Sequence, residues 1–371
     1  MSSRRHTQGS LDGRATAFAV LLAGVAAMAL ASAPAQAAPS GVNPMGLLPA
    51  PGEEGVLIRG DEGPLQWQGA AIPADARIDG ISDQNLPYWN GRFATSPFVA
   101  FLRGTWIGEP PARIAYARYV VQWNVMAGRA VEPDRRYYEA FSAWYGQVRA
   151  LGLIPVLALR TYTGPPPRSV GAYGAALAQL LSAFPVPYVE AWNEPNLTGG
   201  LSVAGAAHLM DEAYEYCRGH RCVAIAGDFA DTPGSAAYAA QYKRDLSPTE
   251  YPQAGDPPEW AVHPYEAVND GGTEAEAIKA ELAADDQLWV TEVGAYYCRS
   301  PDRQYGEGAQ AASALRLLDN VIPALNPVHV FYYEFMYKDS EETPCASESD
   351  TALYVGASDR ARAAASVIFG G

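Results

Sequence analysis

Basic residues are scarce in this chain of 371 residues, where 26 Lys and Arg stand against 41 Asp and Glu and the formal net charge is −15. Nucleic-acid phosphates and anionic lipid surfaces attract positively charged proteins, so this balance opposes both as partners and disfavours a strongly anionic polymer as substrate. Only 18% of the residues are charged, whereas 49% are hydrophobic. This composition is typical of a packed globular core and excludes wholesale disorder.

Two motifs that would indicate other chemistries are missing. The chain has no Gly-x-Ser-x-Gly turn, which an esterase or another hydrolase with a serine nucleophile would need. It also has no Cys-x-x-Cys pair, so its four cysteines lack the usual spacing of zinc ligands. We therefore interpret the cysteines as candidates for disulfides in an exported protein.

The first 37 residues resemble an export signal. Arg4, Arg5 and Arg14 form a positive start, residues 15–30 are uncharged and largely apolar, and residues 35–37 (Ala-Gln-Ala) fit a cleavage site. An uncleaved membrane anchor is the alternative, although the apolar run is short for a span. We expect a secreted, extracellular protein with a signal peptide at 1–37, a leader or N-terminal cap at 38–75 and one domain at 76–371. No other stretch is apolar enough to cross a membrane.

The domain alternates β-rich runs with amphipathic, Ala- and Leu-rich runs. Eight strands are predicted, at 77–83, 117–123, 154–160, 188–193, 223–228, 260–265, 288–293 and 329–335. Helices are predicted at 135–151, 169–184, 203–218, 234–245, 273–284, 308–321 and 358–369. This alternation predicts an α/β fold, a single (β/α)8 TIM barrel. The alternative is a doubly wound open sheet, which usually has a glycine-rich loop after its first strand, and none follows here.

Active sites of such barrels form at the carboxyl ends of the strands, where two glutamates stand out. Glu194 closely follows the fourth predicted strand, and Glu292 lies near the end of the seventh. A lone glutamate at either place is more often a helix cap or a satisfied polar group. Because the two strands face each other across the barrel, both carboxylates can reach one cleft. A convergent carboxylate pair is what cleavage of a glycosidic bond requires.

The run Trp192-Asn193-Glu194-Pro195-Asn196, followed by Glu292 in Thr291-Glu292-Val293-Gly294, resembles glycoside hydrolase clan A. Within that clan of retaining barrel enzymes, the chain is most similar to family 39 and its relatives, and next to family 5. The resemblance covers about residues 77–369. It implies a retaining O-glycosyl hydrolase with Glu194 as general acid/base and Glu292 as nucleophile.

Further site residues are implied by the same resemblance. Asn193 matches an asparagine that binds the sugar 2-hydroxyl, and Arg118 an arginine that keeps the nucleophile ionised. His263 and Tyr265 match residues of strand six that line the catalytic subsite. Strand eight departs from the family pattern, because it has no tryptophan to act as a sugar platform. Tyr333 or Phe335 could replace it, and Glu334 is an unexpected acid there.

Weaker candidates follow from position alone. The side chains of Trp123 and Trp89 could form the base of a sugar-binding subsite, but they could equally belong to the core. Five other polar residues end strands and could contact sugar hydroxyls: Asp83, Gln84, Asn124, Arg160 and Asp228.

The implied mechanism is a double displacement. Glu194 must carry a proton for the leaving oxygen, so we expect burial and the neighbouring Glu292 to raise its pKa. Retention of configuration requires carboxyl groups only about 5–5.5 Å apart. This mechanism needs no metal and no organic cofactor, and we expect a monomer whose partner is a carbohydrate. Net charge and the resemblance favour a neutral β-linked glucan or xylan. A non-catalytic carbohydrate-binding barrel and a transglycosylase remain as alternatives.

The predicted strand placement also suggests how the cysteines pair. Cys217 and Cys222 flank the turn between a helix and the fifth strand, while Cys298 and Cys345 follow the adjacent strands seven and eight. A disulfide needs Cα atoms about 4.4–6.8 Å apart, which both placements allow. We therefore expect Cys217–Cys222 and Cys298–Cys345.

Overall fold

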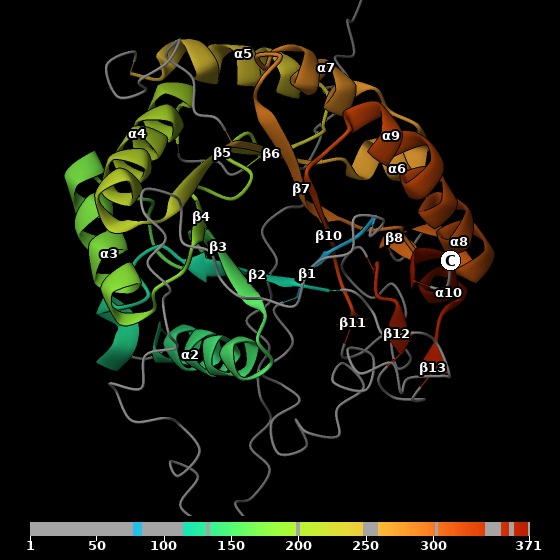
Figure 1. Ribbon diagram of the computed structural model, residues 1–371, viewed down its shortest axis with the longest axis horizontal. Coiled ribbons are helices and arrows are strands. Elements are labelled where there is room, and N and C mark those ends of the chain that lie inside the picture. The colour runs from blue at the N-terminus through green and yellow to red at the C-terminus, as the bar shows by residue number, and fades with distance from the viewer. Residues whose placement is uncertain are drawn as a thin grey trace, which may run out of the picture. The chain divides into compact units, whose positions relative to one another are not determined.

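Eight parallel strands close into a barrel in the computed structural model of the chain (Figure 1), in the circular order β1, β2, β3, β4, β5, β6, β7, β10. Their bounds are Gly80–Ser82 (β1), Tyr116–Gln122 (β2), Ile154–Arg160 (β3), Tyr188–Glu190 (β4), Val223–Ala230 (β5), Glu259–His263 (β6), Gln287–Val293 (β7) and His329–Tyr332 (β10). The ladder between β2 and β3 pairs seven residues, from Tyr116 with Ile154 to Gln122 with Arg160. The predicted (β/α)8 barrel is confirmed.

The structure describes residues 77–83, 114–130, 134–197, 201–247, 259–300, 303–337, 350–355 and 360–369. Contacts divide the chain into residues 1–47 and 48–371, and all described residues belong to the second unit. The predicted signal peptide and leader therefore lie outside the described residues, as do Gln84, Trp89 and Cys345. No helix of the described ranges is long and apolar enough to span a membrane.

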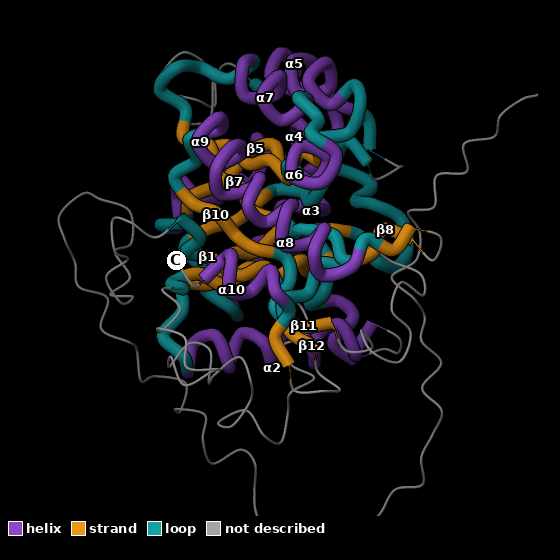
Figure 2. Tube along the Cα trace, turned by 90° about the vertical axis from the view of Figure 1, so that its right-hand side faces the viewer, coloured by secondary structure: helices purple, strands orange, loops and turns teal. Residues whose placement is uncertain are grey.

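Helices surround the strands (Figures 1 and 2). The longer ones are α2 (Asp134–Ala150), α3 (Val170–Ala183), α4 (Val203–His220), α5 (Ser235–Asp245) and α8 (Gly306–Arg316). The shorter ones are η4 (Ala127–Ala130), α6 (Tyr265–Asp270), α7 (Glu274–Ala280), the π-helix η5 (Leu317–Val321), α9 (Ile322–Leu325) and α10 (Ala363–Phe369). Serine side chains cap the amino-terminal ends of α3 and α4. The Ser169 hydroxyl accepts from Ala172 N at 3.2 Å, and the Ser202 hydroxyl accepts from Gly205 N at 3.0 Å.

The core has two parts. The larger one fills the layer between strands and helices, and includes the fully buried Phe141, Trp144 and Tyr173. The smaller one lies inside the barrel and consists of aliphatic and aromatic side chains: Ala115, Tyr116, Ile154, Val156, Ile225, Ala261, Trp289 and Phe331. Because side chains alternate along a strand, Arg118 shares the inward face of β2 with Tyr116 and lies one layer nearer the carboxyl ends. The apolar plug thus forms the floor beneath a polar layer.

Several predicted boundaries are wrong. β4 ends at Glu190 rather than at 193, because the chain bends there and Glu194 adopts a left-handed φ of 47°. β10 ends at Tyr332 rather than at 335, again at a bend. Tyr265 starts helix α6 instead of ending a strand, since the Asp231 carboxylate accepts from the N–H groups of Glu266 and Ala267 at 2.9 and 2.8 Å.

Small strands that the sequence did not predict lie outside the barrel. β8 (Cys298–Ser300) pairs with β9 (Arg303–Gln304), and β12 (Tyr354–Val355) lies between β11 (Met336–Tyr337) and β13 (Arg360–Ala361). β8 and β9 follow β7 in the chain, and β11, β12 and β13 follow β10. Each of these strands has only two or three residues, too few to show a periodic pattern in the sequence.

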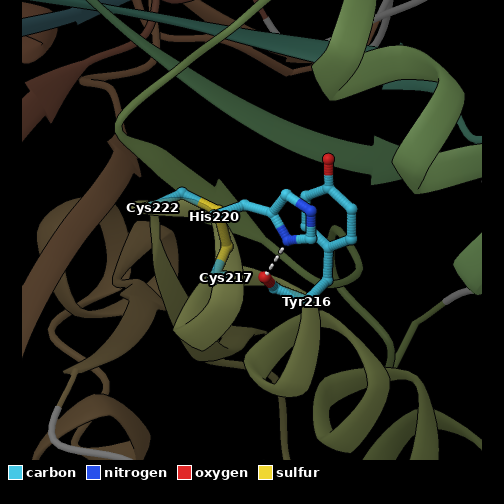
Figure 3. The surroundings of a disulfide bond; sticks show 4 residues. All are labelled: Tyr216, Cys217, His220 and Cys222. Atoms are coloured by element: carbon cyan, nitrogen blue, oxygen red, sulfur yellow. Dashed lines mark hydrogen bonds between the residues drawn. A yellow bond between two sulfur atoms is a disulfide. The ribbon is translucent and has the colours of Figure 1, made fainter.

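A disulfide joins the end of α4 to the start of β5. Cys217 and Cys222 are bonded with Cα atoms 4.5 Å apart, as predicted (Figure 3). Beside it, the ring of His220 stacks on Tyr216 at 4.0 Å between centroids, and its Nδ1 lies 2.8 Å from the Tyr216 carbonyl oxygen. Cys298 is also disulfide-bonded. Its predicted partner, Cys345, lies outside the described residues.

Candidate active site

Arg118 is the centre of a buried polar cluster above the apolar plug. Its side chain is fully buried and donates seven hydrogen bonds to five side chains. Three bonds of 2.7–3.0 Å go to Glu190, and one of 3.1 Å goes to Ser82. The other acceptors are Asn193 Oδ1 at 2.8 Å, Asp228 Oδ2 at 2.9 Å and Glu292 Oε2 at 2.6 Å. We call these residues, together with Glu194 and His263, the Arg118 cluster.

Glu292, the sixth of the seven residues of β7, is held by both of its carboxylate oxygens. Oε2 accepts from Arg118 at 2.6 Å, and Oε1 accepts from the Tyr265 hydroxyl at 2.9 Å. The side chain is 13% exposed, while Arg118 is fully buried. Glu292 is thus an oriented carboxylate with limited access to solvent.

Glu194 lies opposite, just beyond β4. Its backbone N–H donates to Asp228 O at 3.0 Å, and its side chain is 14% exposed. Oε1 is 3.2 Å from His263 Nδ1, and Oε2 accepts from the Asn193 amide at 3.3 Å. One oxygen of Glu194, one of Glu292 and a ring nitrogen of His263 all lie within 4.8 Å of one another. The two carboxylates therefore converge, as their places in the barrel predicted.

The pKa of Glu194 corrects a prediction. Burial raises it, but the hydrogen bond and the positive charge of His263, together with the charge of Arg160, outweigh burial, so the pKa lies below its usual range. The expected raised pKa is therefore wrong for the resting protein. The sequence placed Glu292 near Glu194 but gave no sign that a histidine touches Glu194 directly.

His263, the last residue of β6, is fully buried between two carboxylates. Its Nε2 lies 2.6 Å from Asp228 Oδ1, and its Nδ1 faces Glu194. Burial lowers the pKa of His263, but the charges of Asp228 and Glu292 raise it by more, to well above its usual value. Burial raises the pKa of Asp228, but Arg118 and His263 bring it far below the usual range. Asp228, a minor candidate in the sequence, is thus a central member of the cluster.

Glu190 was not singled out from the sequence. It lies on β4, is fully buried, and receives three hydrogen bonds from Arg118. Burial raises its pKa to about 8, although the Arg118 charge opposes the rise. The available signal was a charged residue inside the apolar run 188–192, because a buried glutamate needs a partner of opposite charge.

The remaining predicted residues differ in their surroundings. Tyr333 is half-buried. The pKa of Tyr265 is raised mainly by burial, and electrostatic interaction with Tyr333 contributes to the rise. Phe335 is fully buried and stacks on Tyr354 at 5.7 Å, so its predicted role as a sugar platform is wrong. Glu334 is also buried, at 1% exposure.

Trp123 is half-buried and lines a cavity of about 540 Å³. The cavity lies between the loops that follow β2 and β3, and its other lining residues include Asn124, Thr163, Pro165, Pro166 and Arg168. None of the lining residues belongs to the Arg118 cluster. A sugar-binding role for Trp123 stays a prediction.

Two groups in the cluster have the composition of a metal site: Glu190 with Asp228 and His263, and Glu194 with His263 and Glu292. In the first group, Arg118 already bonds both carboxylates and lies 3.4 Å from His263 Nε2. A cation there would meet the guanidinium, so the donor set does not fit a metal ion. The second group consists of His263 and the two partly buried carboxylates that converge on it.

No sequence profile of a known family matches the chain, and no curated protein matches it in sequence. Solved structures share the fold. They include a family 39 glycoside hydrolase from the gut symbiont Bacteroides cellulosilyticus WH2, with 17% identity, a TM-score of 0.51 and coverage of 79% of this chain and 63% of that one. An exo-β-1,4-mannosidase from Opitutaceae bacterium strain TAV5 has 12% identity, a TM-score of 0.53 and coverage of 79% and 58%.

A family 17 β-1,3-glucanosyltransferase from Rhizomucor miehei matches over 80% of this chain and 99% of its own, with 11% identity and a TM-score of 0.51. This chain thus spans less than two thirds of the family 39 enzyme and of the mannosidase, but nearly all of the glucanosyltransferase. At these identities the likeness is one of fold. The expected resemblance to glycoside hydrolase clan A is confirmed at that level.

Proposed function

We propose that the chain is a retaining O-glycosyl hydrolase that cleaves a neutral β-linked glycan. The observation that carries the proposal is the pair Glu194 and Glu292, of which one oxygen each lies within 4.8 Å of the other, beyond the end of β4 and near the end of β7. This closeness agrees with the short carboxyl separation of about 5–5.5 Å in retaining enzymes, because inverting enzymes leave room for a water molecule.

The surroundings assign different roles to the two acids. Glu292 is the nucleophile, because Arg118 and Tyr265 hold one oxygen each and direct the carboxylate at the anomeric carbon. Glu194 protonates the leaving oxygen and then takes a proton from the water that releases the sugar. Asn193, which bonds both Arg118 and Glu194, is placed to contact the sugar 2-hydroxyl.

The substrate class rests on two supports. The net charge of −15 disfavours an anionic polymer. Two structures that share the fold are named for β-1,3-glucan transfer and for cleavage of β-1,4-mannosides. We therefore propose a neutral β-glycan, of glucan or xylan type, as substrate of a secreted monomer.

The test combines hydrolysis with rescue. The full chain is assayed on aryl β-glycosides and β-glucans, and turnover with retained configuration is expected. Glu292→Ala should abolish turnover, and azide should restore it with a glycosyl azide of inverted configuration, because the anion attacks from the emptied side. Glu276→Ala is the matched control, since that glutamate is exposed on α7. Normal activity of Glu292→Ala would refute the assignment.

Transglycosylation is a second candidate. It is favoured by the match to the family 17 glucanosyltransferase, which covers 99% of that enzyme and 80% of this chain. The same covalent intermediate would pass to a sugar hydroxyl instead of water. Product analysis at high oligosaccharide concentration distinguishes the two, since a transferase yields products longer than the substrate. A non-catalytic binding barrel would give neither product.

A further inference from the structure

The hydrogen bonds around His263 fix how many protons its ring carries. Asp228 Oδ2 accepts from Arg118 at 2.9 Å, and Oδ1 accepts from the Thr291 hydroxyl at 2.8 Å while lying 2.6 Å from His263 Nε2. A carboxylate with these neighbours acts only as an acceptor. His263 Nε2 must therefore carry a hydrogen, which it donates to Asp228.

The other ring nitrogen faces Glu194. His263 Nδ1 and Glu194 Oε1 are 3.2 Å apart, and two unprotonated acceptors at that distance would repel each other. One proton must therefore lie between them. It resides either on Nδ1, as an imidazolium facing a carboxylate, or on Oε1, as a carboxylic acid facing a neutral ring.

We propose that His263 stores the proton that Glu194 delivers to the leaving group, and that Asp228, His263 and Glu194 form one proton-transfer chain. The inference rests on the proposed function, and His263 acts through Glu194 as a positioning residue. In the resting protein the proton is on His263 Nδ1. When the glycosidic bond breaks, the Nδ1–H bond breaks and that proton passes to the Glu194 carboxylate, which delivers it to the leaving oxygen as the new O–H bond forms. In the second step water gives a proton to Glu194, and the pair regains its resting form.

Charges from every neighbouring strand act on the His263 ring. Arg118 on β2, with Nη2 at 3.4 Å from Nε2, opposes a positive ring. The carboxylates of Asp228 on β5, Glu194 after β4 and Glu292 on β7 favour it, and Glu190 on β4 lies within 4.8 Å. The outcome is a raised pKa for His263 and a lowered pKa for Glu194, despite the opposite effects of burial on both. Both directions place the shared proton on the ring.

The first test needs no variant. The chain has five histidines, so the ring nitrogens of the full-length protein can be resolved and assigned by NMR after selective ¹⁵N-histidine labelling. At pH 7 we expect His263 to be an imidazolium, with both nitrogens protonated. A neutral His263 at pH 7 would overturn the proposal, whatever the protein hydrolyses.

The second test is kinetic and uses His263→Asn, whose amide can still donate a hydrogen bond to Glu194 but stores no proton. For glycosides with poor leaving groups, kcat/KM should fall by about 10²-fold, the lower end of what general acid catalysis contributes. Activated aryl glycosides should be largely spared. The alkaline limb of kcat/KM should also move by at least about one unit to lower pH, because Glu194 then titrates as an ordinary carboxyl.

The matched control is His329→Asn. His329 also bonds a carboxylate, with Nδ1 2.7 Å from Asp79, but it lies at the start of β10, at the opposite end of the barrel. The control should keep the wild-type pH profile. Equal losses of His263→Asn on good and poor leaving groups, with an unmoved alkaline limb, would show a purely structural role. Failure of the wild-type chain to hydrolyse any glycoside would instead count against the proposed function, and the NMR result would still decide where the proton lies.

Discussion

Replacing Arg118 by lysine tests whether the guanidinium holds the cluster together or merely supplies a charge. Arginine donates seven hydrogen bonds to five side chains, four of them buried, from β1, β4, the turn after β4, β5 and β7. Lysine keeps the charge but has only three N–H donors, so at least two of the five acceptors lose their partner.

The loss can be estimated from these numbers. Each hydrogen bond to a buried charged group contributes roughly 1.5–3 kcal/mol, so two lost partners lower the free energy of unfolding by about 3–6 kcal/mol. A domain has only about 5–15 kcal/mol of stability in total, so the variant should be severely weakened. Activity should fall further, because Glu292 loses the contact that orients Oε2.

Urea unfolding at pH 7, followed by circular dichroism, measures the change. Arg149→Lys on α2 is the control, because that side chain is exposed and donates to the Tyr145 hydroxyl, at 3.2 Å, rather than to a buried carboxylate. The control should change stability by less than about 0.5 kcal/mol. If Arg118→Lys unfolds at nearly the wild-type urea concentration and keeps full activity, the cluster does not depend on the guanidinium fork.

Three further predictions concern single groups. Glu194→Ala should retain turnover of aryl glycosides with good leaving groups while losing about 10²-fold or more on oligosaccharides, which need protonation; equal losses on both would exclude Glu194 as the acid. Glu190 is protonated preferentially in the fold, with a pKa of about 8 against about 4.3 when unfolded, so its stabilising contribution is complete below pH 4.3 and is lost as pH rises through 8. Glu190→Gln should therefore flatten the fall in unfolding free energy measured between pH 5 and 8, and an unchanged slope would contradict the raised pKa. Cys217→Ser with Cys222→Ser should cost about 2 kcal/mol by the loop-entropy relation, measured by urea unfolding, and an unchanged midpoint would show that this bond does not stabilise the fold.

The barrel and the two principal acids could be predicted because each depends on local sequence. Long β-rich runs separated by helical runs define the strands, and Glu194 and Glu292 stand where such runs end. The partnership of Glu190 with Arg118 could not be predicted, because it joins positions 72 residues apart and leaves no trace in the residues around either one.

The misassigned residues have a similar cause. Phe335 was placed on a strand, but β10 ends three residues earlier, and the bend turns this ring into the core. His263 was expected to line the subsite. Its contact with Glu194 depends on the left-handed turn that brings Glu194 back over β5, and no glycine marks that turn.

The left-handed backbone at Glu194 and Asp228, with φ of 47° and 58°, has a consequence for engineering this chain. Non-glycine residues resist this conformation, at a cost of order 1 kcal/mol each, and glycine adopts it freely. Glycine at position 194 would remove the strain together with the carboxylate, so any gain in heat resistance at this position would cost turnover. Thermostability and turnover thus oppose each other at this residue, and a directed-evolution screen should score both properties in every round.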